Sequence, residues 1–172
     1  TDWDLWAVPT DGSEPARCLT EDNPAWDASP RFAPDGEALA YLAMERPGYE
    51  SDRFRVMLRP FPDGEARNLT EDWDRSPREL VFAPDGGRLL ATADHLGNHS
   101  LFEVDVATGR VQARLTRHTT SSPQPLGDGR VVVRQDSLVS PAELYVTAGS
   151  GGEPEAITRI NADRLAGLRF GD

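Results

Sequence analysis

The segment Ser-Pro-Arg-Phe-Ala-Pro-Asp-Gly at residues 29–36 decides the fold, because the chain repeats it. Residues 76–86 read Ser-Pro-Arg-Glu-Leu-Val-Phe-Ala-Pro-Asp-Gly, and residues 122–129 again lead from Ser-Pro to Asp-Gly. Asp-Gly beside an apolar run is a strong signal for a two-residue hairpin turn, because both residues tolerate the positive φ that such turns need. Each copy therefore predicts the turn between the first two strands of one unit.

Every unit also ends in the same way, on an apolar residue followed by threonine. The closing threonines are Thr20, Thr70, Thr116 and Thr158, spaced 50, 46 and 42 residues apart. A second turn precedes each of them, at Asp11-Gly12, Asp63-Gly64, Thr108-Gly109 and Gly151-Gly152. A period of this length with two hairpins per repeat is typical of the four-stranded blades of a β-propeller.

Apolar patterning predicts how these strands are buried. The second strands are continuous apolar runs at 38–42, 89–93 and 131–133, which indicates sheets covered on both faces. The third strands alternate, with Val56 and Leu58 on one face in the first full unit. In the first strands, which we expect to start at the Ser-Pro steps, the inward residues are Phe32, then Leu80 and Phe82. Helical periodicity is weak, and a short helix is expected only within 161–168.

These patterns predict an all-β chain of about three and a half four-stranded antiparallel propeller blades. The expected divisions are a half blade at 1–20, blades at about 27–70, 74–116 and 120–158, and a tail at 159–172. Propellers usually close with about four to eight blades. We therefore expect a fragment of a larger ring, or two copies that associate through their open blade edges.

Composition excludes several classes of partner. The formal net charge of −11 argues against nucleic acid, whose binding depends on Lys and Arg displacing counterions from phosphates. No apolar stretch approaches the roughly 18 residues of a membrane span, so no membrane partner is expected. The one cysteine, Cys18, excludes an internal disulfide framework and leaves the redox compartment open. We favour a cytoplasmic over a periplasmic location.

The residues that could carry chemistry do not form a recognisable catalytic or metal motif. His95 and His99 have the i, i+4 spacing of helical metal ligands, but they flank a connection between strands, and His118 stands apart. The acidic clusters do not match a calcium loop, and residues 148–152 lack the first glycine of a Gly-x-Ser-x-Gly nucleophile elbow. No catalytic residue, metal or cofactor is therefore predicted.

Several motifs resemble a known family. The repeats at 29–36 and 76–86 resemble the WD-like propeller repeat shared by Tol-system propellers and the prolyl oligopeptidase family of serine peptidases. The segments 46–53, 70–77 and 161–168 resemble bacterial dipeptidyl and acylaminoacyl peptidases of that family. The resemblance implies a peptide substrate and an α/β-hydrolase domain of the same polypeptide that follows the tail and carries the catalytic triad. The alternative is a non-enzymatic Tol-type module that binds a protein partner.

The segment Arg46–Arg53 differs from the other units, because it is an insertion between the second and third strands. Its candidate substrate-binding residues are Tyr49, Glu50, Asp52 and Arg53. In related dipeptidyl peptidases, propeller carboxylates hold the free amino terminus of the substrate, and a buried ammonium needs such a counter-charge. The resemblance thus implies this role for Glu50 or Asp52, and a salt-bridged surface loop is the competing interpretation.

Overall fold

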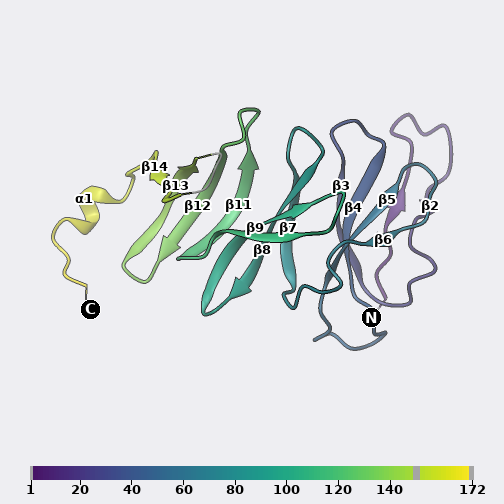
Figure 1. Cartoon of the computed structure of the whole chain (residues 1–172), viewed down its shortest axis with the longest axis horizontal. Coiled ribbons are helices and arrows are strands. Elements are labelled where there is room, and N and C mark those ends of the chain that lie inside the picture. Colours follow the sequence, from purple (N-terminus) through teal and green to yellow (C-terminus); the bar gives the residue numbers. More distant parts are fainter. Residues whose placement is uncertain (1, 149–151, 171–172) are drawn as a thin grey trace. The chain divides into compact units, whose positions relative to one another are not determined.

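The computed structural model describes residues 2–148 and 152–170, and nearly all of its regular structure is β-strand (Figure 1). The chain separates into two compact units, Thr1–Pro77 and Arg78–Asp172. Within the described ranges, no helix is long and apolar enough to cross a membrane.

The first unit contains one short and one complete antiparallel sheet. The short sheet pairs β1 (Trp6–Ala7) with β2 (Arg17–Cys18). The complete sheet is a meander of β3 (Asp27–Phe32), β4 (Ala38–Ala43), β5 (Arg55–Pro60) and β6 (Arg67–Asn68). A half blade is thus followed by one full four-stranded blade.

The second unit contains two more meanders. The first consists of β7 (Pro77–Phe82), β8 (Arg88–His95), β9 (Asn98–Asp105) and β10 (Val111–Leu115), where Pro77 is the last residue of the first unit. The other consists of β11 (Thr119–Pro125), β12 (Val131–Ser137), β13 (Ser140–Thr147) and β14 (Glu155–Ala156). A single parallel pair, Thr119 with His99, joins β11 to β9. The two meanders are therefore separate blades, and the predicted blade architecture is confirmed.

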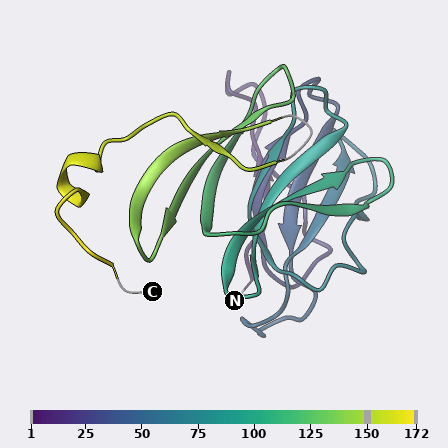
Figure 2. The same cartoon turned by 60° about the vertical axis from the view of Figure 1, so that its left-hand side comes forward.

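The tail after the last blade holds the only helix in the described ranges. Helix α1 (Ala162–Leu165) lies inside the predicted 161–168 window, and Figure 2 shows it beyond the last hairpin, in yellow. None of its residues is buried. The tail is attached instead through Glu143 of β13, whose carboxylate accepts hydrogen bonds from the Thr158 hydroxyl and from the backbone N–H of Asn161.

The core lies where the continuous apolar strands were predicted. In the first unit, Leu5 and Leu19 of the half blade pack against Leu39, Tyr41 and Ala43 of β4. In the second unit, the corresponding cluster combines Leu90, Leu101, Leu115, Val131 and Val133. Residues from both faces of β4 and β8 are buried, as expected for sheets that stack against neighbouring sheets.

The first strand of the first full blade differs from the prediction. Phe32 was expected to point inward, but its exposed fraction is 55%, and its ring forms a T-shaped pair with the Phe61 ring. The strand begins at Asp27 rather than at Ser29, and Ser29-Pro30 forms a bulge with Ser29 at φ 54°. A bulge inserts one residue and changes which face later residues occupy. In β7, Leu80 and Phe82 are buried as predicted.

Turns are present at the predicted Asp-Gly positions, but they are not two-residue turns. Five residues separate the strands in each case, and only the glycine of each pair has a positive φ. Gly36, Gly86 and Gly129 of the Asp-Gly turns have positive φ values of 77°, 70° and 85°. Gly64 does not. There a Cβ would lie 2.7 Å from the Cβ of Pro60, so glycine is required by close approach. In the predicted turn at Gly151-Gly152, Gly151 lies outside the described residues.

Candidate functional site

The predicted insertion is a long loop, residues 44–54, between β4 and β5. In the other two full blades, the corresponding strands are joined by two-residue turns at Leu96-Gly97 and Leu138-Val139. This loop, called here the 44–54 loop, brings the four predicted substrate-binding residues onto one segment. The structure shows what each of them contacts.

Asp52 is buried and holds the loop together. Its side chain is 4% exposed. One oxygen, Oδ2, accepts hydrogen bonds from the backbone N–H groups of Glu45 and Arg46 at 2.8 and 2.9 Å, and Oδ1 accepts two more from the Arg46 guanidinium. Burial alone would raise the pKa of this carboxyl, but these donors outweigh it and hold the pKa well below its usual range.

Tyr49 and Glu50 lie on the outer surface of the loop. The Arg46 guanidinium lies over the Tyr49 ring at 4.1 Å from its centroid, a cation–π contact. The carbonyl oxygen of Tyr49 accepts the backbone N–H of Asp52 at 2.9 Å, which fixes the turn. Both Tyr49 and Glu50 remain exposed. They are the two predicted residues that a ligand can reach.

Arg53 anchors the loop to the segment after β6. Its guanidinium donates to the backbone carbonyl oxygens of Thr70, Glu71 and Trp73. Next to it, the backbone N–H of Phe54 donates to the Ser76 hydroxyl at 3.1 Å. Three backbone acceptors for one side chain make Arg53 a structural support of the loop.

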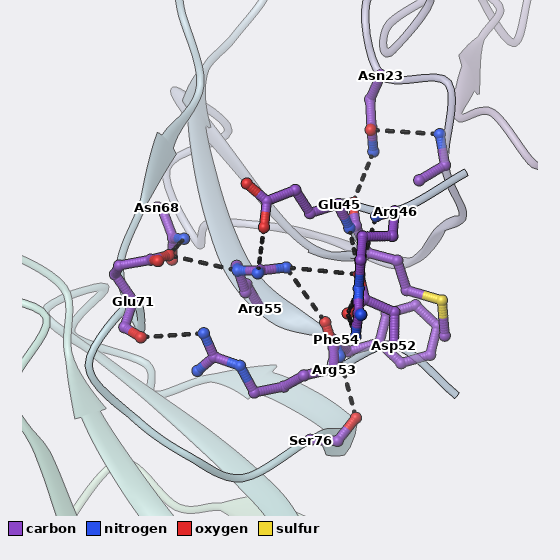
Figure 3. Close-up of polar contacts among 12 residues, drawn as sticks. Asn23, Glu45, Arg46, Asp52, Arg53, Phe54, Arg55, Asn68, Glu71 and Ser76 are labelled. Atoms are coloured by element: carbon purple, nitrogen blue, oxygen red, sulfur yellow. Dashed lines mark hydrogen bonds and ion pairs between the residues drawn. The ribbon is translucent and has the colours of Figure 1, made fainter. Parts of the chain in front are cut away.

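Arg55 joins the loop to its surroundings and was missed by sequence reasoning. It lies among three carboxylates, at 2.6 Å from Glu45, 3.3 Å from Glu71 and 3.9 Å from Asp52 (Figure 3). Its side chain is 12% exposed. Strand alternation gave the signal, because Val56 and Leu58 face one side and so place Arg55 on the other.

The two Trp-Asp pairs of the sequence do not occupy equivalent positions. Asp27 is buried at the start of β3, whereas the Asp74 side chain is 82% exposed. Oδ1 of Asp27 accepts the Asn23 amide at 3.0 Å, and Oδ2 has no hydrogen-bond partner. Burial in this setting raises the pKa of Asp27 to about 7. Asp27 and Asp74 therefore differ in their structural roles.

No group of three or more His, Cys, Asp or Glu side chains within residues 2–148 and 152–170 is arranged to hold a metal ion. Two of the three histidines have other side-chain contacts. His99 is 2.8 Å from the Asp94 carboxylate, and His95 meets the Phe102 ring edge to face.

Comparison with known proteins relates the chain to peptidases. No family model matches the chain. It is 25% identical over 150 residues to dipeptidyl-peptidase 5 of Porphyromonas gingivalis, covering 86% of this chain and 22% of that protein. It is 32% identical over 154 residues to probable dipeptidyl-peptidase 5 of Aspergillus niger, covering 85% and 20%. The chain thus spans about one fifth of the length of these relatives.

Solved structures share the fold. The acylaminoacyl peptidase of Pyrococcus horikoshii superposes with a TM-score of 0.74 at 20% identity, over 98% of this chain and 24% of that one. The β-propeller domain of the Trilobed protease from Pyrococcus furiosus gives 0.68 at 17%, over 93% and 47%. A putative TolB from Agrobacterium tumefaciens gives 0.68 at 19%, over 90% and 56%.

The blades and these superpositions define a β-propeller, of which the described residues form about three and a half blades. Within that class, the relatives identify the chain as propeller-domain sequence of the prolyl oligopeptidase family of peptidases. The family resemblance seen in the repeats and in residues 46–53 is confirmed.

Proposed function

We propose that the chain is the non-catalytic propeller portion of a serine peptidase, and that it gates and positions short peptides for an α/β-hydrolase domain of the same polypeptide. The match to two dipeptidyl-peptidase 5 proteins over 85–86% of the chain carries this proposal. In this arrangement the residue 159–172 tail leads towards the hydrolase domain. The acyl-enzyme chemistry of a serine nucleophile would belong to that domain.

The 44–54 loop supports a role in positioning. A group that orients a substrate must itself be held in place, since misplacement by about 1 Å can be costly for rate. Asp52 and Arg53 supply that support with seven hydrogen bonds from buried or half-buried side chains. Tyr49 and Glu50 are then the residues that contact a peptide, with the Glu50 carboxylate facing its free amino terminus.

Kinetics of the full-length protein test this role. In the Glu50→Gln variant, we expect KM for peptides with a free amino terminus to rise about three- to tenfold, the loss of one charge-assisted contact. KM for N-acylated peptides should not change. Glu14→Gln, which removes an exposed carboxylate from the same unit outside the loop, is the matched control. An unchanged KM for free-amine peptides would refute the assignment of Glu50.

A second assay tests whether the propeller portion alone is catalytic. The 172-residue chain alone should not hydrolyse peptide substrates, because the proposal places the nucleophile, base and acid in the hydrolase domain. Measurable hydrolysis that survives repeated purification would contradict the non-catalytic role.

The second candidate is a Tol-type binding module without an enzymatic domain. The superposition on TolB supports it at the level of the fold. The curated relatives favour the peptidase. A Gly-x-Ser-x-Gly elbow after residue 172 in the full-length protein would decide for the peptidase, and its absence there for the binding module.

A further inference from the structure

A groove in the first unit lies apart from the exposed tip of the 44–54 loop. It runs between β2 with the following residues 21–23 and the face of the β4–β6 sheet. It is open to solvent and has a volume of about 950 Å³. We call it the interblade groove. Its size falls within the range of small-molecule binding pockets, roughly 300–1,000 Å³.

The charge of the interblade groove is unbalanced. Five carboxylates and two guanidinium groups line it, a formal excess of three negative charges. Arg55 is already paired with Glu45 and Glu71, and Arg59 donates to the backbone carbonyl of Leu19. The remaining three carboxylates have no ion-pair or hydrogen-bond partner among the described residues, and they are Glu21, Asp22 and Glu65.

A tyrosine hydroxyl in the groove wall also has no hydrogen-bond partner among the described residues. Tyr41 is 5% exposed and lines the groove, and its hydroxyl makes no hydrogen bond within the described part of the chain. Burial, and then the negative charge of Asp27 and Asp22, raise the pKa of this phenol to about 12, so it stays protonated. Its oxygen retains two acceptor lone pairs. The hydroxyl is therefore available to a donor that occupies the groove.

The rest of the wall is apolar. Ala43, Met44 and Met57 line the groove beside Tyr41. Methionine adapts to irregular aliphatic shapes, and an alkyl chain is the natural neighbour of such a wall. A ligand that satisfies the groove therefore combines an alkyl stem with a compact positive charge that donates several hydrogen bonds.

We propose that the interblade groove binds a primary ammonium group carried on an aliphatic chain, as in a lysine side chain of a peptide or in a polyamine. The ammonium group donates up to three hydrogen bonds, which matches carboxylates together with a phenol oxygen. Glu21, Asp22 and Glu65 supply the counter-charge, and Met44 and Met57 cover the stem. The proposal concerns a different site from the one assigned to the peptide amino terminus, and it does not depend on that assignment.

The test is a titration of the isotope-labelled 172-residue chain followed by NMR. N-acetyl-lysine methylamide and spermidine are the two probes, and N-acetyl-norleucine methylamide is the uncharged control. We expect saturable shifts of the amide signals of Asp22, Tyr41 and Glu65 with at least one amine and none with norleucine. Binding of the lysine probe alone indicates a peptide ligand, and binding of spermidine alone indicates a polyamine. The absence of shifts with both amines, or equal shifts with norleucine, would overturn the proposal.

Variants separate specific binding in the groove from nonspecific attraction by the net negative charge of the chain. Glu21→Gln, Asp22→Asn and Glu65→Gln should each weaken binding about two- to fivefold, the contribution of an exposed ion pair. The matched control is Glu37→Gln, which removes the charge of an exposed glutamate in the Asp35-Gly36 turn, outside the groove. Equal weakening by Glu37→Gln would show that only net charge matters, and it would refute the site.

Cys18 gives a second, independent measurement. It is the only cysteine of the chain, it is half-buried, and it lines the interblade groove. A bound amine should therefore slow its alkylation by iodoacetamide, with the same concentration dependence as the NMR shifts. An alkylation rate that is insensitive to saturating amine would contradict binding in this groove.

Discussion

Arg46 and Asp52 close the 44–54 loop upon itself, because Nε and Nη2 of the arginine donate to the same carboxylate oxygen at 3.1 and 3.0 Å. The other oxygen of Asp52 accepts two backbone N–H groups. All strong acceptor positions of the carboxylate are therefore used inside the loop. Asp52 therefore acts as a support of the loop, whereas Tyr49 and Glu50 remain exposed.

The Asp52→Ala substitution should destabilise the chain by about 2–3 kcal/mol. It leaves two backbone donors and a guanidinium without the acceptor that the buried Asp52 side chain, 4% exposed, provides. A buried donor without a hydrogen-bond acceptor costs about 1–3 kcal/mol. Urea unfolding measures the change in the free energy of unfolding. Glu50→Ala is the comparison from the same loop, with an expected effect within about 0.5 kcal/mol. Equal effects of the two variants would contradict the support role of Asp52.

The tail is predicted to detach when Glu143 loses its charge. Hydrogen bonds from the Thr158 hydroxyl and then from the Asn161 backbone lower the pKa of Glu143 from 4.5 to about 2. The bonds are therefore at full strength above pH 4.5, and they weaken as the pH falls towards 2. Amide protection factors at residues 161–165 should decline over that interval in native-state hydrogen exchange.

In Glu143→Gln, protection at residues 161–165 should be several-fold lower at neutral pH, and its dependence on acid should vanish, since charge-assisted bonds are about twice as strong as neutral ones. Glu155→Gln changes an exposed glutamate of the neighbouring strand β14 and serves as the control. A tail that keeps its protection in Glu143→Gln would show that other contacts hold it.

The continuous apolar strands should dominate stability. Leu89 of β8 is fully buried, and Leu89→Ala should cost about 2–5 kcal/mol in the free energy of unfolding, the range for leucine truncation in a core. Leu138, in the turn between β12 and β13, is fully exposed, and Leu138→Ala should change it by less than about 0.5 kcal/mol. Comparable costs at both positions would contradict the assignment of the core.

Short-range signals made the fold predictable from the sequence. Asp-Gly turns and apolar runs report on local backbone geometry and on burial, and both are set by residues close together in the chain. The position of Phe32 was not predictable in this way. Ser29-Pro30 was recognised as a repeated step, but whether it begins a strand or forms a bulge inside one depends on how β4 pairs with it.

The candidate site was predictable only in part. The insertion at 46–53 could be found because it interrupts a period, and its residues do lie on one loop. The sequence did not show which of these residues are exposed and which support the loop. Asp52 and Arg53 are supports because of hydrogen bonds to residues 7 and 17 positions away, whereas Tyr49 and Glu50 are exposed. Arg55 was missed for the same reason, since its partner Glu71 lies 16 residues away and looked like a solvated turn residue.

Asp27 is predicted to make the first unit less stable as the pH rises from about 4 to 7. Its pKa is raised from 3.8 to about 7, first by burial, against hydrogen bonds from Asn23 and Thr20, and further by the charges of Asp4 and Asp22. The folded state thus retains a proton that the unfolded state loses. The stabilisation is complete below pH 3.8 and is lost as the pH rises through 7.

The Asp27→Asn substitution keeps the shape of the side chain and removes its charge. At pH 8 it should stabilise the chain by about 1–2 kcal/mol. The full pKa shift, at about 1.4 kcal/mol per unit, would correspond to more, but water partly screens the site. Near pH 4 it should be close to neutral. Urea unfolding of both proteins at several pH values measures the difference, which must grow between pH 4 and 7. A difference that stays constant with pH would mean that Asp27 is ionised in the folded state at all these pH values, despite its burial.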